Sequence, residues 1–276
     1  MTASAGRLWV VATPIGNLDD LSPRAAEALR SAGLVAAEDT RHSAPLLARV
    51  GSTARTIALH DHNEREQAAR IVEVILAGHD VALIADAGTP LISDPGFRLV
   101  RAVREAGCAV STVPGPCAAI AALSVAGLPS DRFAFEGFLP AKAAARRERM
   151  RSLASETRTL IFYESSHRIA ESIADAADVF GAAREAVLAR ELTKLFETVI
   201  AAPLGEILAR VEADANQRRG EFVVLVAGAD AADADATLAE GRRVFALLRD
   251  ELAPAKAAKL AAAITGAPRK ALYAAD

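Results

Sequence analysis

The stretch ALIADAGTPLISDPG, residues 82–96, holds two carboxylates in a loop that directly follows an apolar run. Asp86 and Asp94 can accept hydrogen bonds from hydroxyl or amino groups, or face a positive charge. Gly88 lets a ligand approach the backbone closely, and two prolines stiffen the loop. Because the loop contains no lysine or arginine, it fits a neutral or cationic ligand better than a phosphate.

A turn whose aspartates only cap the following helix has the same composition, and the loop alone does not decide between the two interpretations. The chain contains neither the G-x-G-x-x-G fingerprint nor a P-loop. Nicotinamide cofactors and nucleoside triphosphates are therefore disfavoured as ligands.

Ionisable side chains also gather in the stretches EDTRHS and LHDHNE. The second stretch holds His60, His62 and Glu64, and this spacing raises the alternative of a metal site because imidazole and carboxylate groups bind metals. No further motif completes a tetrahedral site. A polar surface at the end of a strand is the favoured interpretation, and no metal is predicted.

Residues 142–158, KAAARRERMRSLASETR, carry six lysines and arginines against two glutamates, in a chain whose net charge is −3. Cations in such a segment contact nucleic-acid phosphates without reading sequence. The alternative is an exposed helix that binds nothing. We favour RNA contacts, from Lys142, Arg146, Arg147, Arg149 and Arg151.

Strand-like and helix-like patterns alternate up to about residue 116, which predicts βαβ units and a largely parallel sheet buried on both faces. We assign 1–116 to an N-terminal α/β domain and 117–229 to a second α/β domain. The acidic, alanine-rich stretch 229–240 is predicted to be a linker, and 236–276 a small helical tail module. The loop 82–96 then lies at the carboxyl end of a parallel strand, where open α/β sheets bind ligands.

Composition limits the function classes. With 52% hydrophobic and 24% charged residues, the chain is typical of a globular protein, and its charge argues against bulk attraction to nucleic acid or membranes. Cys108 and Cys117 cannot form a disulfide framework or a paired zinc motif. Neither a secretory signal nor an apolar run of about 20 residues is present. We expect a cytoplasmic protein with no membrane partner.

Eight stretches occur in order across nearly the whole chain: LWVVATPIGNLDDLSPRA, AAEDTRHS, LHDHNE, IADAGTPLISDPG, VPGPCAAIAAL, ESSHRI, RELTKLFET and GEFVVLVAG. Together they closely resemble the ribosomal RNA small subunit methyltransferase I family of the tetrapyrrole methylase superfamily. The resemblance implies two α/β domains that hold S-adenosylmethionine in the cleft between them, usually in a homodimer. It also implies 2'-O-methylation of a cytidine ribose in the decoding region of 16S rRNA, within the small ribosomal subunit.

The loop ADAGTPLIS resembles the superfamily's Gly-Asp-Pro cofactor loop, with Gly88, Thr89 and Pro90 in place of that triplet. Thr89 departs from the usual aspartate, so the resemblance does not decide whether Asp86, Thr89 or Asp94 makes the polar contact to the cofactor. The implied cofactor-binding residues are Pro14, Gly16, Asp86, Gly88, Thr89, Pro90, Ile92, Ser93, Ala118, Ala119, Tyr163 and Leu192.

The stretch RELTKLFET supplies the catalytic candidates Lys194 and Glu197. Lysine and glutamate recur in unrelated 2'-O-methyltransferases as proton acceptor and orienting group; the alternative here is a solvated loop with internal ion pairs. Two rival functions stay open: a tetrapyrrole or diphthine-type methyltransferase with the same fold, and a non-catalytic RNA-binding factor in ribosome assembly. The basic segment disfavours the first, and a retained cofactor site disfavours the second.

Overall fold

The structure is a computed structural model that describes residues 5–272, without the side chains of 231–234. The chain divides into two compact units, Met1–Ala121 and Ala122–Asp276. Helix α5 (Ala118–Ala126) crosses this division, and the boundary predicted at residue 116 lies just before that helix.

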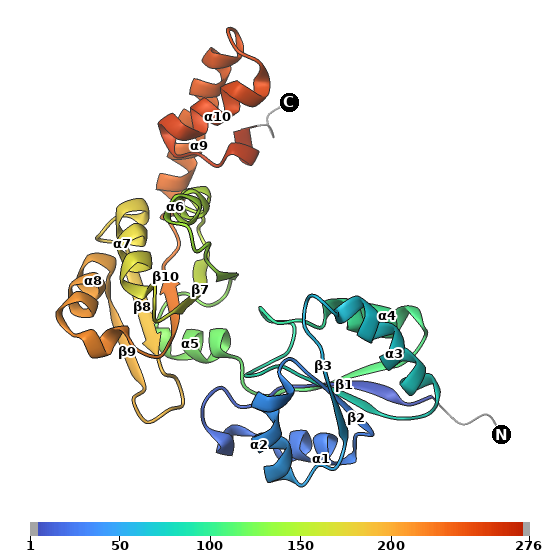
Figure 1. Ribbon diagram of the computed structural model, residues 1–276. Helices are drawn as coiled ribbons and strands as arrows, with labels where there is room; N and C mark the ends of the chain where they lie inside the picture. The colour runs from blue at the N-terminus through green and yellow to red at the C-terminus, as the bar shows by residue number, and fades with distance from the viewer. Residues whose placement is uncertain (1–4, 273–276) are drawn as a thin grey trace. The chain divides into compact units, whose positions relative to one another are not determined.

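The first unit is built on a five-stranded sheet in the order β3-β2-β4-β1-β5 (Figure 1). All four neighbouring strand pairs are parallel, which confirms the predicted parallel sheet. The strands are β1 (Arg7–Val11), β2 (Leu34–Ala37), β3 (Arg55–Ala58), β4 (Val81–Ile84) and β5 (Ala109–Val113).

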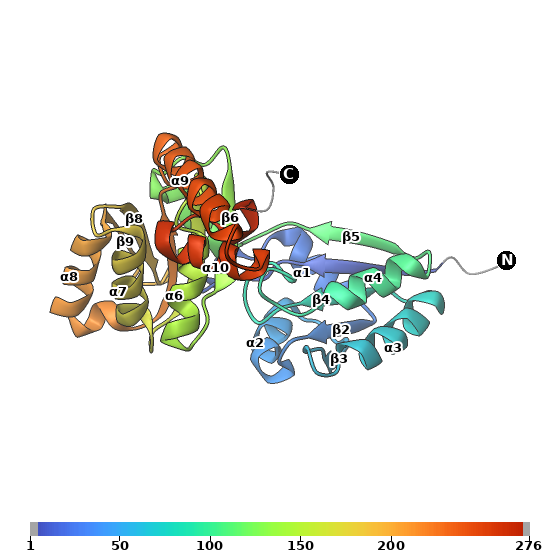
Figure 2. The ribbon, with the colours of Figure 1, turned by 90° about the horizontal axis from the view of Figure 1, so that it is seen from above.

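Helices cover both faces of this sheet (Figure 2). Because side chains alternate along a strand, Val35 of β2 packs in the layer of α1 (Pro23–Ser31) and α2 (Thr40–Val50). Its neighbour Ala36 packs in the layer of α3 (Glu64–Leu76) and α4 (Phe97–Glu105). The sheet is therefore buried on both sides, and its ligand-binding potential is confined to the ends of the strands.

Glu64 is the first residue of α3 and caps the start of α4. It is 3% exposed, and its Oε1 accepts backbone N–H groups from Gly96 (3.1 Å), Arg98 (2.7 Å) and Leu99 (3.1 Å). The first N–H groups of a helix lack partners within the helix, and the helix dipole favours an anion there. The carboxylate of Glu64 is therefore engaged by the helix end, which disfavours the metal alternative for His60, His62 and Glu64.

The second unit is built on a mixed five-stranded sheet in the order β6-β7-β10-β8-β9. Strand β6 pairs parallel to β7, and the other three pairs are antiparallel. The strands are β6 (Phe133–Phe138), β7 (Thr159–Ser165), β8 (Glu185–Arg190), β9 (Thr198–Pro203) and β10 (Glu221–Val226).

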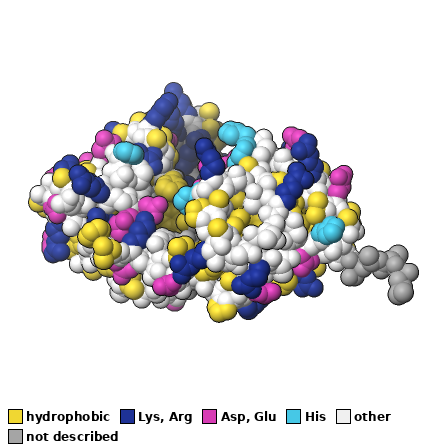
Figure 3. Space-filling model, turned by 60° about the horizontal axis from the view of Figure 1, so that its bottom comes forward, with side chains coloured by type: hydrophobic (Ala, Val, Ile, Leu, Met, Phe, Trp, Pro, Cys, Tyr) yellow, Lys and Arg dark blue, Asp and Glu magenta, His cyan; other side chains and the backbone are white. Residues whose placement is uncertain are grey.

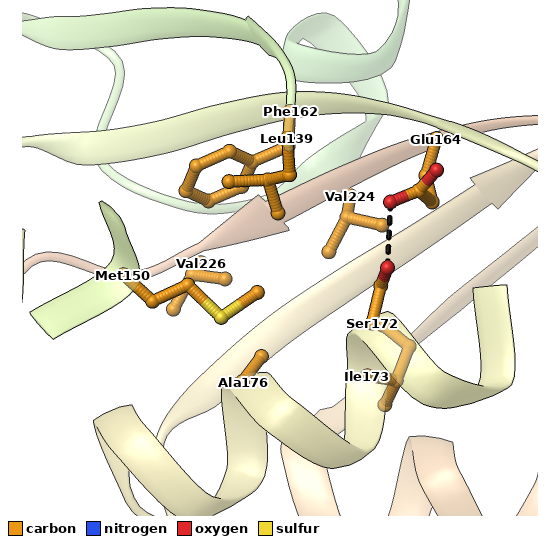
Figure 4. Close-up of a pocket in the computed structure, with 9 residues that line it drawn as sticks. All are labelled: Leu139, Met150, Phe162, Glu164, Ser172, Ile173, Ala176, Val224 and Val226. Carbon is orange, nitrogen blue, oxygen red and sulfur yellow. Dashed lines mark hydrogen bonds between the residues drawn. The ribbon is translucent and has the colours of Figure 1, made fainter. Parts of the chain in front are cut away.

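Helices α6 (Ala143–Ser152), α7 (Ile169–Phe180) and α8 (Leu204–Ala213) share one core with this sheet. A small cavity in that core is lined mainly by apolar side chains (Figure 4). At one end of it, the hydroxyl of Ser172 donates a hydrogen bond of 2.6 Å to Glu164. Glu164 also forms an ion pair of 2.7 Å with Arg168. The buried carboxylate is thus satisfied, and the cavity offers no free polar group to a ligand.

The C-terminal helices have a small core of their own. Helix α9 (Ala231–Arg249), helix α10 (Pro254–Thr265) and the short helix η3 (Arg269–Leu272) contribute Phe245, Ala257, Ala258, Ala261, Ala267 and Leu272 to it. The linker predicted over 229–240 is wrong from residue 231 onward, because α9 begins there. Alanine is the strongest helix former, so an alanine-rich stretch can be a helix as well as a linker. The end of the predicted tail, 273–276, lies outside the described residues.

No helix within residues 5–272 combines the length and apolar character that a membrane span needs. Cys108 is buried and Cys117 is half-buried, and both are free thiols.

Replacing Glu64 should destabilise the chain far more than replacing an exposed glutamate of the same helix. Glu64→Ala leaves three N–H groups without their acceptor, and we expect a loss of about 3 kcal/mol in the free energy of unfolding. Glu64→Gln should recover part of this loss, since the amide oxygen still accepts. Glu66→Ala removes only an exposed ion pair with Arg70, and its effect should be below about 0.5 kcal/mol. Urea denaturation measures all three, and equal losses for the two alanine variants would contradict the capping role.

Candidate functional site

The loops that follow β1 and β4 are joined by a short backbone bridge. Thr13 donates its N–H to the carbonyl of Gly88 (2.9 Å), and Gly88 donates its N–H to the carbonyl of Thr13 (3.1 Å). The bridge places Pro14 and Gly16, which follow β1, beside the loop that follows β4. Two predicted parts of the cofactor site thus lie together at the carboxyl edge of the first sheet.

Gly88 occupies a position that other residues would fill poorly. Its φ is +82°, and an added Cβ would lie 3.3 Å from Cγ2 of Ile15 and 3.6 Å from the carbonyl oxygen of Pro116. The adjacent hydroxyl of Thr89 donates to the same carbonyl of Pro116 at 2.9 Å. Because that hydroxyl proton is used within the chain, the aspartates are the better candidates for the polar contact to a ligand.

The chain beyond Pro116 enters α5, whose first residues are Ala118 and Ala119. Ala119 is buried, and neither residue has a side chain larger than a methyl group. The hydrogen bond from Thr89 therefore brings the predicted small residues of α5 next to the loop after β4.

Carboxylates from two neighbouring strands are interlinked at this edge. Asp39 follows β2 and donates its backbone N–H to Oδ1 of Asp86 at 3.0 Å. Asp86 follows β4 and donates its own N–H to Oε2 of Glu38 at 3.3 Å. Glu38 is absent from the predicted cofactor-binding residues, although it directly follows β2, just as Asp86 comes after the adjacent strand β4.

The third carboxyl group, that of Asp94, carries an unusual pKa. Burial, together with the charges of Glu38 and Asp86, raises the pKa of Asp94 to about 7. Burial also raises the pKa of Glu38; the backbone hydrogen bond from Asp86 opposes this rise, and the charges of Asp86 and Asp61 add to it. A nearby cation stabilises the ionised form of carboxylates that repel one another at a partly desolvated site. We call Glu38, Asp86 and Asp94 the acidic group.

The segment between Asp86 and Asp94 has a strained backbone. Leu91 and Ser93 have φ values of +75° and +69°, a region that residues other than glycine seldom adopt. Ile92 lies between them and is 37% exposed. Such conformations cluster at functional sites, where the surrounding structure holds them. Ile92 and Ser93 were predicted to bind the cofactor, and they lie in this segment, as does buried Pro90.

Two predicted cofactor-binding residues belong to the second unit. The half-buried ring of Tyr163 makes edge-to-face contacts with Phe135 and Phe138, at centroid distances of 4.9 and 5.6 Å. Leu192 is 9% exposed and lies between Glu191 and Thr193, whose φ values are +52° and +66°. The chain after β8 therefore forms a turn in which two non-glycine residues adopt the left-handed conformation.

Lys194 and Glu197 lie in that turn, in different surroundings. Lys194 Nζ donates to Glu191 (2.9 Å) and to Glu221 (2.8 Å). Burial lowers the pKa of Lys194, but these hydrogen bonds outweigh it, and the pKa is raised overall. Glu197 accepts the backbone N–H of Thr193 at 2.5 Å. In this arrangement Lys194 is a cation and a poor proton acceptor.

Arg146 is buried, which corrects its assignment to RNA binding. Its side chain is 1% exposed, and its guanidinium donates to Asp175 (2.6 Å) and to Glu171 (3.3 Å). Both partners belong to α7, so Arg146 fastens α6 to α7. A cation that faces the interior cannot contact a phosphate.

The other cations of the basic segment differ in how they are paired. Arg147 pairs with Asp175 and Arg149 with Glu136. Lys142 and Arg151 are exposed and form no ion pair with any other described side chain. On the face that Figure 3 shows, lysines and arginines alternate with aspartates and glutamates and form no continuous basic field. The segment thus offers phosphates fewer free cations than its sequence indicates.

Comparison with known proteins gives matches over nearly the whole chain. Residues 7–208 match the family model described as Tetrapyrrole (Corrin/Porphyrin) Methylases, and residues 228–275 match the RsmI C-terminal HTH domain. Two proteins named ribosomal RNA small subunit methyltransferase I, from Xylella fastidiosa (strain Temecula1) and Pseudomonas aeruginosa, are 60% and 59% identical to it. Each alignment covers 98% of this chain, with 99% and 96% of the relatives.

A solved structure of uroporphyrin-III C-methyl transferase from Thermus thermophilus, complexed with S-adenyl homocysteine, has the same fold. It is 18% identical, with a TM-score of 0.55, and the match covers 80% of this chain and 97% of that one. This likeness confirms the expected tetrapyrrole methylase architecture.

The burial of Arg146 is tested by stability. Arg146→Ala removes a partner of the buried carboxylate of Asp175, and we expect a loss of about 3 kcal/mol in the free energy of unfolding. Arg151→Ala, on the exposed side of the same helix, should change it by less than about 0.5 kcal/mol. Guanidinium denaturation of both variants measures the difference. A stable Arg146→Ala protein with weakened RNA binding would restore the original assignment.

Proposed function

The chain belongs to the ribosomal RNA small subunit methyltransferase I family, and from this we propose that it methylates the ribose 2'-hydroxyl of a cytidine in the decoding region of 16S rRNA. The observation that carries the proposal is the full-length match, about 60% identical, which extends through the C-terminal helices. The substrate is the small ribosomal subunit, and we propose that the protein acts in the cytoplasm as a homodimer.

We propose S-adenosylmethionine as the methyl donor, because the first unit suits it. When bound, it supplies a methyl group on a positively charged sulfur. The acidic group would stabilise that charge, and its raised pKa values are those expected of carboxylates that lack a counter-ion. The residues present therefore fit a cationic cofactor.

The ribose oxygen must lose its proton as it accepts the methyl group, and must lie in line with the breaking bond. We propose Lys194 and Glu197 for this step, with Lys194 as the proton acceptor and Glu197 holding the turn. Lys194 must first lose the hydrogen bonds to Glu191 and Glu221 that keep it protonated. In this view substrate binding rearranges the turn before the reaction.

Methyl transfer from labelled S-adenosylmethionine into small subunits that lack this modification tests the function directly. We expect label at one ribose, recognised by nuclease mapping and by resistance of the adjacent linkage to alkali. Gly88→Ala should lower transfer strongly, because the added Cβ would crowd Cγ2 of Ile15 at 3.3 Å. Gly51→Ala is the matched control, since its φ is +71° with open space around it. Cofactor binding without any transfer to RNA would favour a tetrapyrrole or diphthine-type substrate, and no cofactor binding would favour an assembly factor.

The acidic group should make cofactor affinity depend on pH. As the pH rises through about 7, Asp94 ionises, and a cationic ligand should bind up to about tenfold more tightly. S-adenosylhomocysteine lacks the sulfonium charge, so its affinity should stay nearly constant over the same range. Calorimetric titration of both ligands between pH 6 and pH 8 measures this contrast. Asp94→Asn should remove the pH dependence of cofactor affinity. Asp178→Asn, in α7, is the control and should keep it. Parallel pH profiles for the two ligands would refute the charge contact.

The role of Lys194 is tested through its partner Glu221. Glu221→Gln removes a negative charge that raises the pKa of Lys194, although the amide oxygen can still accept its hydrogen bond. If Lys194 accepts the proton, the ascending limb of the pH profile of kcat should move to lower pH in this variant. Lys194→Met should lower kcat with little change in KM. An unmoved limb in Glu221→Gln would exclude Lys194 as the acceptor.

A further inference from the structure

A bulge in β6 places two phenylalanines on one face of the second sheet. Phe135 pairs with Ile161 of β7, and Phe138 pairs with Tyr163, with a register shift between them at Glu136. Residues three apart normally point to opposite faces of a strand. The extra residue reverses the alternation, so both rings lie on the side of Tyr163, as their contacts show.

This face is opposite to the helices α6 and α7. Phe162, which precedes Tyr163, packs in the core with Met150 of α6 and Ile173 of α7 (Figure 4). Tyr163 therefore points away from that core. Strand β6 is also an edge strand, so no further strand covers its outer side. The three rings of Phe135, Phe138 and Tyr163 form what we call the aromatic platform.

Phe138 is the outermost member of the platform. It is 56% exposed, and its ring is held in an edge-to-face contact with Tyr163 at a centroid distance of 5.6 Å. A large apolar ring that is both exposed and held by a neighbour loses little entropy when a flat ligand stacks on it. Tyr163 is itself braced by Phe135.

Cations follow the platform closely in the chain. Lys142 follows Phe138 by four residues and is exposed at the start of α6. Arg149 of α6 pairs with Glu136, the bulge residue, and so fixes the basic helix to the strand that carries Phe138. Aromatic rings beside cations are the combination that binds single-stranded nucleic acid, with the rings for bases and the cations for phosphates.

We propose that Phe138 stacks on an unpaired base of the RNA substrate, and that Lys142 contacts a phosphate of the same strand. This inference rests on the proposed function. The adenine of the cofactor is the other flat candidate, but S-adenosylmethionine carries no phosphate to match the adjacent cations. Phe138 is thereby a substrate-binding residue that the sequence does not mark.

The test uses the full-length protein and a short single-stranded RNA that carries one 2-aminopurine. Phe138→Ala should weaken RNA binding by at least about fivefold and abolish the quenching of the 2-aminopurine emission. Phe138→Trp should retain both. Phe133→Ala, at the other end of β6, is the matched control and should bind as the wild type does. Lys142→Ala should reduce the dependence of affinity on salt, whereas Phe138→Ala should leave that slope unchanged.

Methyl transfer to small subunits separates the possible failures. If the wild type transfers methyl groups and Phe138→Ala raises KM for subunits with kcat nearly constant, the inference is supported. If Phe138→Ala instead weakens S-adenosylmethionine binding and leaves RNA affinity unchanged, the platform belongs to the cofactor and the inference is wrong. If the wild type neither binds RNA nor methylates subunits, the proposed function fails first, and the inference fails with it.

Discussion

The paired hydrogen bonds between Thr13 and Gly88 are the constraint on which the first unit's site depends. Helices cover both faces of the parallel sheet, so only the strand ends are free to bind a ligand. The bridge joins the loop after β1 to the loop after β4. The hydrogen bond from Thr89 to Pro116 joins the segment after β5 to the same loop. The loops of three strands thus become one surface, and each substitution at Gly88 acts on all of them.

That surface concentrates negative charge, and the repulsion between the carboxylates lowers the stability of the folded protein. Backbone N–H groups of Asp39 and Asp86 offset part of it by donating to neighbouring carboxylates. Asp94 has no such donor among the described hydrogen bonds, and burial, with the charges of Glu38 and Asp86, raises its pKa. The acidic group is therefore suited to the cationic ligand that we propose, in contrast to Glu64, whose charge three backbone donors satisfy. Charge that folding satisfies is structural, and charge that it leaves unsatisfied indicates binding.

The sequence predicted the central strands of both sheets and the edge strands β5 and β6, but missed the other two edge strands, β3 and β9. No residue of β3, Arg55–Ala58, is fully buried, so its apolar pattern is weak. The roles of Glu64 and Arg146 could not be predicted either, because their partners lie about 30 residues further along the chain. Loop positions such as Gly88 could be predicted because the motif that marks them consists of residues adjacent in the sequence. The pairing of Phe138 with Tyr163 depends on a bulge, which shifts the register without a clear signature in the sequence.

The RNA binding that we propose draws little on charge. The net charge is −3, Arg146 forms ion pairs with α7, and Arg149 pairs with Glu136 of β6. A protein with so few unpaired cations in its basic segment gains little from counter-ion release, so the proposal relies on contacts that salt does not screen. Exposed aromatic surface supplies such contacts, because stacking depends on ring area and not on charge. The ion pair of Arg149 with Glu136 also joins α6 to β6, the strand that carries Phe138. Few unpaired cations beside an exposed ring favour recognition of an unpaired base over nonspecific attachment to any duplex.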